Sequence, residues 1–414
     1  MQSSNDRIRI AVIGAGAAGL LCAAECGAMG ADVTLYEKND KVGRKLAITG
    51  KGRCNLTNDC EPAEFIKNIV SNPRFMNSAI YSFTPEDTKA LFERLGVELK
   101  TERGRRVFPL SDKSYDIVDA LKKYALSSAR IKFECVRDII VEDGRVTGVV
   151  TDKGRAFYDR VIVATGGRSY PLTGSTGDGY RFARTASHTV TPLSPSLVPL
   201  TSKEPICPAL MGLSFKNTAI KIIHDKTNKV VYEDFGEMLF THFGLSGPMI
   251  LSASSHLHSI HPSECTLVID IKPALDEKTM DAKLIAILTE AKNKSFENAI
   301  RPILPAKLAE YLPHYLGIDP KKKANEITRE ERRRVLEAIK GLRVKLSGFR
   351  PIEEAIITRG GVSTKEIDPK SMKSKLCEGL YFIGEVLDVD AYTGGYNLQI
   401  AFSSAVAAAR DAVR

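Results

Sequence analysis

Hydrophobic positions near both ends of the chain predict buried strands that alternate with helices. Residues 7–14 form a short apolar run typical of a buried strand, and the small residues that follow predict a helix. Residues 32–37 predict a second strand, so this order is a βαβ unit with a parallel sheet. Near the other end, residues 379–384 predict another buried strand and residues 397–414 an alanine-rich helix.

Shorter alternating runs follow in the second hundred residues. Residues 130–141, 145–151 and 155–158 predict strands, because Glu-Asp-Gly and Asp-Lys-Gly turns separate them. Residues 160–164 predict a buried strand that ends at a pair of glycines. We therefore expect a β-meander that leads back into the parallel sheet.

The pattern changes after about residue 195. Prolines there separate short strand-like runs, at residues 218–224, 229–234 and 265–271. From Glu277 to Leu346 the apolar positions recur with helical spacing, as in Val335, Ile339 and Leu342. The simplest topology is one α/β domain, interrupted by a β-rich part and a helical part, with boundaries at 1–194, 195–274, 275–345 and 346–414.

The first strand ends in a GxGxxG motif, Gly14-Ala15-Gly16-Ala17-Ala18-Gly19. Gly14 permits a tight turn, Gly16 lets the backbone approach a pyrophosphate, and Gly19 allows close packing of helix on strand. Glu37 stands at the end of the second strand, where a carboxylate can accept hydrogen bonds from ribose hydroxyls. In this context the motif predicts a dinucleotide site.

Three further features favour FAD over NAD. The loop at residues 42–55 carries three glycines and four cations, which suits a long polyanionic cofactor. A strand end at residues 164–167 and the segment 383–399, with its own glycine turn and helix start, lie far from the motif. A domain that binds only NAD needs no such C-terminal half, whereas the ribityl and ring parts of FAD extend beyond the first site. We expect tightly, non-covalently bound FAD.

Composition and charge limit the other classes. The longest small and apolar run, residues 11–24, is shorter than the roughly 18 residues that cross a bilayer, so we expect no membrane span and a cytoplasmic protein. The formal charge is +9, but the densest basic stretch, residues 321–334, is interleaved with glutamates and predicts a solvated helix face. Nucleic acid is therefore not expected as a partner, and the oligomeric state stays open.

Cysteine spacing predicts neither a metal site nor a disulfide redox centre. The eight cysteines include no CxxC pair and no Cys/His cluster with zinc-ligand spacing. Cys22 and Cys26 lie four residues apart on the first predicted helix, which for free cysteines indicates ordinary packing. Cys54 has no resolving partner, so a redox role for it is disfavoured.

Four long strings resemble one family of flavoproteins. They are GRKLAITGKGRCNLTN (43–58), GGRSYPLTGSTGDGY (166–180), FTHFGLSGP (240–248) and LYFIGEVLDVDAYTGGYNLQIAFSSA (380–405). In these four segments the sequence is similar to the BaiN/YhiN-like flavoproteins. Members of that family are labelled NAD(P)/FAD-dependent oxidoreductases, aminoacetone oxidase family proteins or bile-acid reductases. The resemblance covers nearly the whole chain and is weakest at 275–345.

The resemblance implies a discontinuous Rossmann-like FAD-binding domain with an inserted β-barrel-like domain and a small helical domain. Glu385 stands where broader flavoprotein families usually place Asp. With the GxGxxG motif, the resemblance assigns these FAD-binding candidates: Gly14, Ala15, Gly16, Ala17, Ala18, Gly19, Glu37, Lys38, Arg44, Lys45, Thr49, Gly50, Arg53, Cys54, Asn55, Val136, Ala164, Thr165, Gly166, Gly384, Glu385, Asn397 and Leu398.

Few side chains are candidates for chemistry on the substrate. The N-terminus of the last helix, near Asn397, can direct its positive end at the flavin and stabilise the reduced anion. His242 is a candidate proton donor in a glycine-rich stretch, although it could equally serve to orient that loop. Tyr392 and Tyr170 are alternative donors beside glycine turns, where a packing role is more common for an aromatic residue.

These features predict an FAD-dependent oxidoreductase that uses NAD(P)H to reduce an activated C=C bond in a small organic substrate. No second GxGxxG follows residue 19, so NAD(P)H would dock only transiently. Three alternatives stay open: an amine or alcohol oxidase that uses oxygen, an RNA-modifying flavoprotein suggested by the basic charge, and a redox sensor without turnover.

Overall fold

The computed structural model describes residues 7–414 and forms two compact units. The first unit combines Met1–Ser196 with Ile352–Arg414, and the second is Leu197–Pro351. The first unit therefore contains both ends of the chain, and the second unit is inserted between its two parts.

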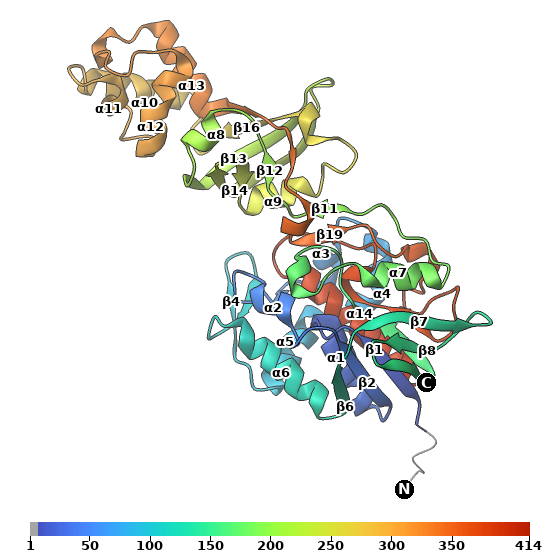
Figure 1. The fold of residues 1–414 in the computed structure, drawn as a ribbon. Coiled ribbons are helices and arrows are strands. Elements are labelled where there is room, and N and C mark those ends of the chain that lie inside the picture. The colour runs from blue at the N-terminus through green and yellow to red at the C-terminus, as the bar shows by residue number, and fades with distance from the viewer. Residues whose placement is uncertain (1–6) are drawn as a thin grey trace. The chain divides into compact units, whose positions relative to one another are not determined.

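A five-stranded parallel sheet forms the centre of the first unit (Figure 1). Its order is β20 (Leu380–Phe382), β10 (Arg160–Val163), β1 (Arg9–Ile13), β2 (Asp32–Glu37) and β6 (Ala129–Phe133). Ile10, Ala11 and Val12 are completely buried, as in a parallel sheet covered on both faces. Because β20 pairs with β10, the C-terminal part of the chain completes a sheet that the N-terminal part begins. The predicted Rossmann-type α/β fold is confirmed.

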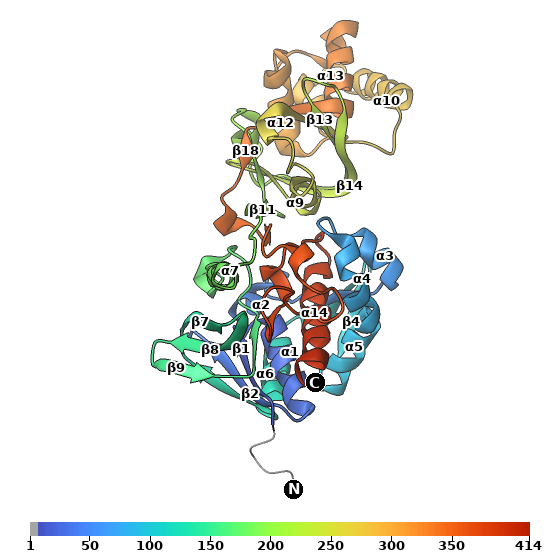
Figure 2. The ribbon, with the colours of Figure 1, turned by 90° about the vertical axis from the view of Figure 1, so that its right-hand side faces the viewer.

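Two helices rich in small residues pack side by side against this sheet (Figures 1 and 2). They are α1 (Ala17–Ala28) and α14 (Tyr396–Ala412). The alanines of both helices, the glycines of α1 and the serines of α14 allow close backbone approach, and most of both helices is buried. The other helices of this unit are α2 (Arg44–Ile48), α3 (Pro62–Lys67), α4 (Pro73–Ser82), α5 (Pro85–Arg94), α6 (Ser114–Leu126) and α7 (Asp178–Thr185).

The β-meander is present, with one correction to its first strand. The continuous strand predicted over residues 130–141 is two strands, β6 and β7 (Val136–Glu142). The first pairs with β2 in the parallel sheet, whereas β7 pairs with β8 (Arg145–Thr151) in an antiparallel sheet. Alternation alone does not show where a chain leaves one sheet for another. The meander is completed by β9 (Gly154–Phe157).

Two smaller sheets lie in the first unit. One contains β3 (Thr57–Asn58), β5 (Arg106–Pro109) and β4 (Leu99–Glu102), in that order. The other pairs β11 (Ser194–Ser196) with β19 (Ile357–Arg359). Both join segments that are distant in sequence.

The second unit contains a curled antiparallel sheet. Its order is β17 (Leu342–Lys345), β16 (Cys265–Asp270), β13 (Ser214–His224), β14 (Val230–Thr241), β15 (Gly244–Ser246), β12 (Leu200–Thr201) and β18 (Gly348–Phe349). The edge strands β17 and β18 are separated by only two residues, which span about 7 Å. The sheet must therefore curl until its edges approach each other, as in a partly open barrel.

Helices accompany this sheet. Two short ones, α8 (Ile206–Ala209) and α9 (Pro248–Ser254), precede a helical stretch with α10 (Glu277–Glu290), α11 (Phe296–Ala299), α12 (Ala306–Leu316) and α13 (Arg329–Gly341). The helical pattern predicted up to Leu346 is wrong over residues 342–345, which form β17. Leu342 and Val344 are buried while Arg343 is exposed, so the period there is two. Within residues 7–414, no helix has the length and apolar character of a membrane span.

Candidate functional site

The carboxyl ends of three neighbouring parallel strands bring three groups of predicted cofactor residues to one edge of the sheet. Strand β1 ends before Gly14, β10 before Ala164, and β20 shortly before Gly384. Ligands of open α/β sheets bind outside this edge. The structure thus brings together, from three distant parts of the sequence, the fingerprint, the 164–166 turn and the 384–385 turn.

The fingerprint glycines have three different surroundings. Gly14 has a φ of +102°, and a methyl group there would lie 2.6 Å from the carbonyl oxygen of Ala164. A methyl group at Gly19 would lie 1.8 Å from the carbonyl oxygen of Gly14, so helix α1 packs directly on the turn. Gly16 has open space, with no atom within 4 Å of such a methyl group. Open space beside the first N–H groups of α1 fits the pyrophosphate of a dinucleotide.

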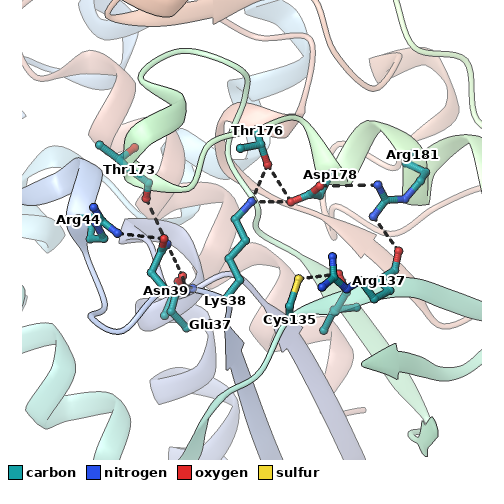
Figure 3. A network of polar contacts seen from close by, with 12 residues as sticks. Glu37, Lys38, Asn39, Arg44, Cys135, Arg137, Thr173, Thr176, Asp178 and Arg181 are labelled. Carbon is teal, nitrogen blue, oxygen red and sulfur yellow. Dashed lines mark hydrogen bonds and ion pairs between the residues drawn. The ribbon is translucent and has the colours of Figure 1, made fainter. Parts of the chain in front are cut away.

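Glu37 is held in a fixed orientation at the end of β2. It is 7% exposed, and one carboxylate oxygen accepts a hydrogen bond from the Ala15 N–H at 2.9 Å. The other oxygen accepts from the backbone and side-chain nitrogens of Asn39, at 2.8 and 2.6 Å (Figure 3). Asn39 also accepts from Arg44 at 3.1 Å. Sequence reasoning missed Asn39, which follows the acidic strand end but belongs to no motif.

Lys38 is held by protein side chains (Figure 3). Its ammonium group lies 2.6 Å from Asp178 and 2.5 Å from the hydroxyl of Thr176. Burial opposes ionisation of Asp178, but the hydrogen bond and charge of Lys38 outweigh it and lower the pKa of this carboxyl. Lys38 therefore ties β2 to the start of α7. In turn Arg181 of α7 donates to the carbonyl of Arg137, one residue after the buried Val136 at the start of β7.

Three buried hydroxyls between residues 165 and 180 have no hydrogen-bond partner among the described residues. They are Thr165 Oγ1, Ser175 Oγ and Tyr180 Oη. A methyl group at Gly166 would lie 2.8 Å from Ser175 Oγ, so this hydroxyl faces the turn directly. Buried polar groups are nearly always satisfied, and unsatisfied ones indicate a missing ligand or water. The hydroxyls fit a polar cofactor. Ser175 and Tyr180 lie in the segment 166–180, but the sequence did not identify them as candidate site residues.

The glycine-rich loop after α2 has a strongly constrained backbone. Gly50, Lys51, Gly52 and Cys54 all have positive φ, from 59° to 83°, and Thr49 donates to the carbonyl of Lys45 at 3.0 Å. The predicted cofactor residue Arg53 is held by protein carboxylates, since it lies 2.5 Å from both Glu102 and Asp112. Its guanidinium also stacks on Phe108, 4.2 Å from the ring centre. Arg53 therefore fixes this loop to the β4–β5 hairpin.

Cys54 lies completely buried in the same loop. Burial raises the pKa of its thiol to about 12, so the reactive thiolate is scarce at neutral pH. We expect iodoacetamide at pH 8 to leave Cys54 unmodified in the folded protein, while the more exposed Cys135 reacts. Peptide mass spectrometry measures both, and rapid labelling of Cys54 under native conditions would contradict the burial that makes its thiol unreactive.

Glu385 and Lys45 form the centre of a polar network between the 384–385 turn and α2. One Glu385 oxygen lies 2.5 Å from the Lys45 ammonium. The other accepts from Ser169 Oγ at 3.0 Å and from the Thr358 N–H at 2.9 Å. A methyl group at Gly167 would lie 2.9 Å from this same oxygen, so the network needs the glycine. Both carboxylate oxygens are engaged by protein, and Thr358, outside every motif, was not foreseen.

A second glycine turn precedes α14. Gly394 and Gly395 have φ of 123° and 99°, and a methyl group at Gly395 would lie 2.3 Å from the backbone of Thr57. The amide of Asn55 lies between the Thr57 carbonyl and the Gly395 N–H, at 3.2 and 3.1 Å. The Asn397 side chain accepts a hydrogen bond from the Ala391 N–H and donates one to the Ala391 carbonyl. The adjacent Leu398 is half-buried. The turn is thus anchored from both sides, leaving the start of α14 as a fixed source of N–H donors.

The candidate proton donors lie in different places. Tyr392 is half-buried two residues before Gly394, and Tyr170 has a left-handed backbone with φ of 52°. His242 belongs to the second unit, where it is exposed between β14 and β15 with its ring 5.0 Å from that of Phe243. Their roles stay predictions. Residues 7–414 contain no group of three or more His, Cys, Asp and Glu side chains arranged to hold a metal ion.

A parallel sheet completed by a C-terminal strand, with a dinucleotide fingerprint at one turn and a second glycine turn before the last helix, is the architecture of an FAD-dependent oxidoreductase. The chain belongs to the family described as "HI0933-like protein Rossmann domain", whose model matches residues 8–411.

Relatives and solved structures extend over nearly the whole chain. A protein of Escherichia coli (strain K12), named ribosomal RNA dihydrouridine synthase, is 32% identical over 99% of this chain and 98% of its own. The 3-dehydro-bile acid delta(4,6)-reductase of Clostridium scindens is 29% identical, covering 98% of each. The 3-ketosteroid-delta4-(5alpha)-dehydrogenase of Rhodococcus jostii RHA1 shares the fold, with a TM-score of 0.52, 15% identity, and 99% and 98% of the two chains covered.

Proposed function

We propose that this chain uses bound FAD to reduce a carbon–carbon double bond conjugated to a carbonyl, and that this bond is C5=C6 of a uridine in ribosomal RNA. The observation that carries the proposal is the end-to-end similarity to the E. coli protein, which is named for making dihydrouridine. The C. scindens relative is named for reducing a 3-oxo steroid, so both names describe the same kind of bond reduction. FAD, when bound, supplies the hydride for this chemistry.

Some residues of this chain would bind the cofactor, and others would act on the uridine base. The fingerprint, Glu37 and the three unpartnered hydroxyls would hold the cofactor along the sheet edge. The start of α14 would offer N–H donors to the flavin and favour its reduced, anionic form. Reduction also needs a proton at the second carbon, and Tyr392, just before the glycine turn, is our candidate donor.

NAD(P)H is the electron donor in this proposal. The chain has one dinucleotide fingerprint, so the nicotinamide would reduce the flavin by transient docking. The earlier expectation that nucleic acid is not a partner receives weak support at most, because a full-length relative is named after ribosomal RNA. A small enone remains the second candidate substrate, and the C. scindens relative is the observation that favours it.

Anaerobic mixing with NADPH or NADH tests the reductase part of the proposal. We expect either nucleotide to bleach the flavin absorbance, and ribosomal RNA from cells lacking this protein to restore it. Mass spectrometry of the digested RNA should then show dihydrouridine. Restoration by a 3-oxo-Δ4 steroid alone would select the second candidate. A flavin that resists both nucleotides but is reduced by amines or alcohols, with oxygen consumption, would show an oxidase instead.

A further inference from the structure

An arginine-rich hairpin borders the glycine turn that precedes α14. Its tip, between β4 and β5, contains Arg103, Gly104 and Arg105, and Arg106 follows directly. The side-chain amide of Asn58 donates to the carbonyl of Gly104 at 3.0 Å and to that of Gly394 at 3.1 Å. One buried amide thus couples the tip of the hairpin to the turn where the flavin is proposed to lie.

The hairpin exposes positive charge that carboxylates of the protein neutralise only in part. Arg103 and Arg106 are exposed and form no ion pair with any residue in 7–414. Arg105 contacts Glu64 at 2.6 Å, but both side chains are more than half exposed, so an external anion can compete for it. By contrast, the cations at the base of the hairpin are paired. Asp112 lies 2.7 Å from Lys100 and 2.5 Å from Arg53. The unsatisfied charge is therefore concentrated at the tip.

The tip of the hairpin has an unusual backbone conformation. Gly104 and Arg105 have φ of 77° and 57°, and the Arg106 guanidinium donates back to the Arg103 carbonyl at 3.0 Å. Left-handed backbone disfavours arginine relative to glycine or asparagine, so the tip retains an arginine at a conformational cost. Guanidinium groups match the oxygens of phosphates. An RNA strand offers several phosphates in a row to these arginines, whereas a bile acid offers a single carboxylate.

We infer that Arg103, Arg105 and Arg106 form a phosphate-binding edge that holds the RNA strand flanking the uridine. This inference rests on the proposed function. A base that reacts at the flavin must leave its stack, and the phosphates on either side then approach the protein. The hairpin would hold those phosphates beside the glycine turn, without touching the base itself.

Charge-removing substitutions test this edge. The variant is Arg103→Gln/Arg106→Gln, and its matched control is Lys292→Gln/Lys321→Gln, which removes two exposed charges from the second unit. The probe is a fluorescent single-stranded RNA of ribosomal sequence, titrated at several salt concentrations. We expect the slope of log affinity against log salt to flatten by about 1.4 in the arginine variant, because each single-strand phosphate contact contributes about 0.7. The lysine control should keep the wild-type slope.

Turnover gives an independent readout. In the arginine variant the KM for ribosomal RNA should rise about tenfold with kcat little changed, since phosphate contacts position the strand without specifying chemistry. The rate of flavin reduction by NAD(P)H should not change. This rate also shows that the variant is folded and holds its cofactor.

The outcomes separate this inference from the proposed function. If the wild type makes dihydrouridine but the arginine variant keeps its salt slope and KM, the phosphate-binding edge is overturned and the function stands. If the wild type binds RNA through the hairpin but makes no dihydrouridine, the function fails and the edge stands. Absence of salt-dependent RNA binding by the wild type would overturn the edge directly.

Discussion

Replacing Gly16 with Asp is expected to give a folded but colourless protein. Gly16 has φ of −82° and ψ of −167°, which any residue adopts, and a side chain there meets no atom within 4 Å. Aspartate is also a favoured residue at this N-cap position, so α1 should be stabilised by a few tenths of a kcal/mol. Its carboxylate would occupy the place of the pyrophosphate and repel it. Like charges in contact cost several kcal/mol, so FAD affinity should fall by about a thousandfold or more.

Gly16→Asn is the matched control for this experiment. Asparagine has nearly the same shape without the charge, so it should lose clearly less FAD than Gly16→Asp. Circular dichroism and the thermal midpoint of the apo-protein check the fold. Gly19→Ala should instead lower stability, because its methyl group would lie 1.8 Å from the carbonyl oxygen of Gly14. A Gly16→Asp protein that keeps its full complement of FAD would contradict the placement of the pyrophosphate.

Replacing Glu385 with Ala is expected to destabilise the first unit and weaken FAD binding together. The side chain is 16% exposed and accepts from Lys45, Ser169 and the Thr358 N–H. Alanine removes the acceptor of the Thr358 N–H and the counter-charge of Lys45, which keeps only its bond to Ser169 Oγ, at a cost of about 2 to 4 kcal/mol. The effect should be visible in urea unfolding of the apo-protein, because the network is complete without the cofactor. FAD titration then measures the loosening of the 384–385 turn.

A double-mutant cycle separates the ion pair from the rest of the network. Lys45→Met, Glu385→Ala and the double variant should show a coupling of roughly 1 to 3 kcal/mol, since the two side chains are in direct contact and largely buried. Glu385→Gln keeps one acceptor oxygen and should lose less than Glu385→Ala. Purely additive effects in the cycle would show that the pair contributes nothing beyond its separate contacts.

The edge of the sheet that carries the site was predictable, because the sequence shows where each parallel strand begins and ends. Once residues 7–14, 160–164 and 379–384 are identified as parallel strands, their carboxyl ends must meet at one edge. Where the expectation failed, the missing information was tertiary. The strand at 342–345 exists because β16 is available as a partner, although its residues continue a helical pattern.

Within the site, the ends of strands were easier to predict than the partners of side chains. Glu37 follows from its place at a strand end, but the bonds of Glu385 to Thr358 and Ser169 join segments that only the fold brings together. Arg53 is a different case. A cation in a glycine-rich loop predicts a cofactor contact, which stays a prediction, and the sequence did not show that Glu102 and Asp112, 49 and 59 residues away, hold its guanidinium. The FAD contacts themselves stay predictions.

The most direct test of the central claim, that both ends of the chain close on one FAD, is release of the cofactor from the purified protein. The protein should show a flavin absorption spectrum, and denaturation should release one FAD per chain, identified by mass spectrometry. A colourless, nucleotide-free preparation that does not take up added FAD, or a protein that releases FMN instead, would contradict the account.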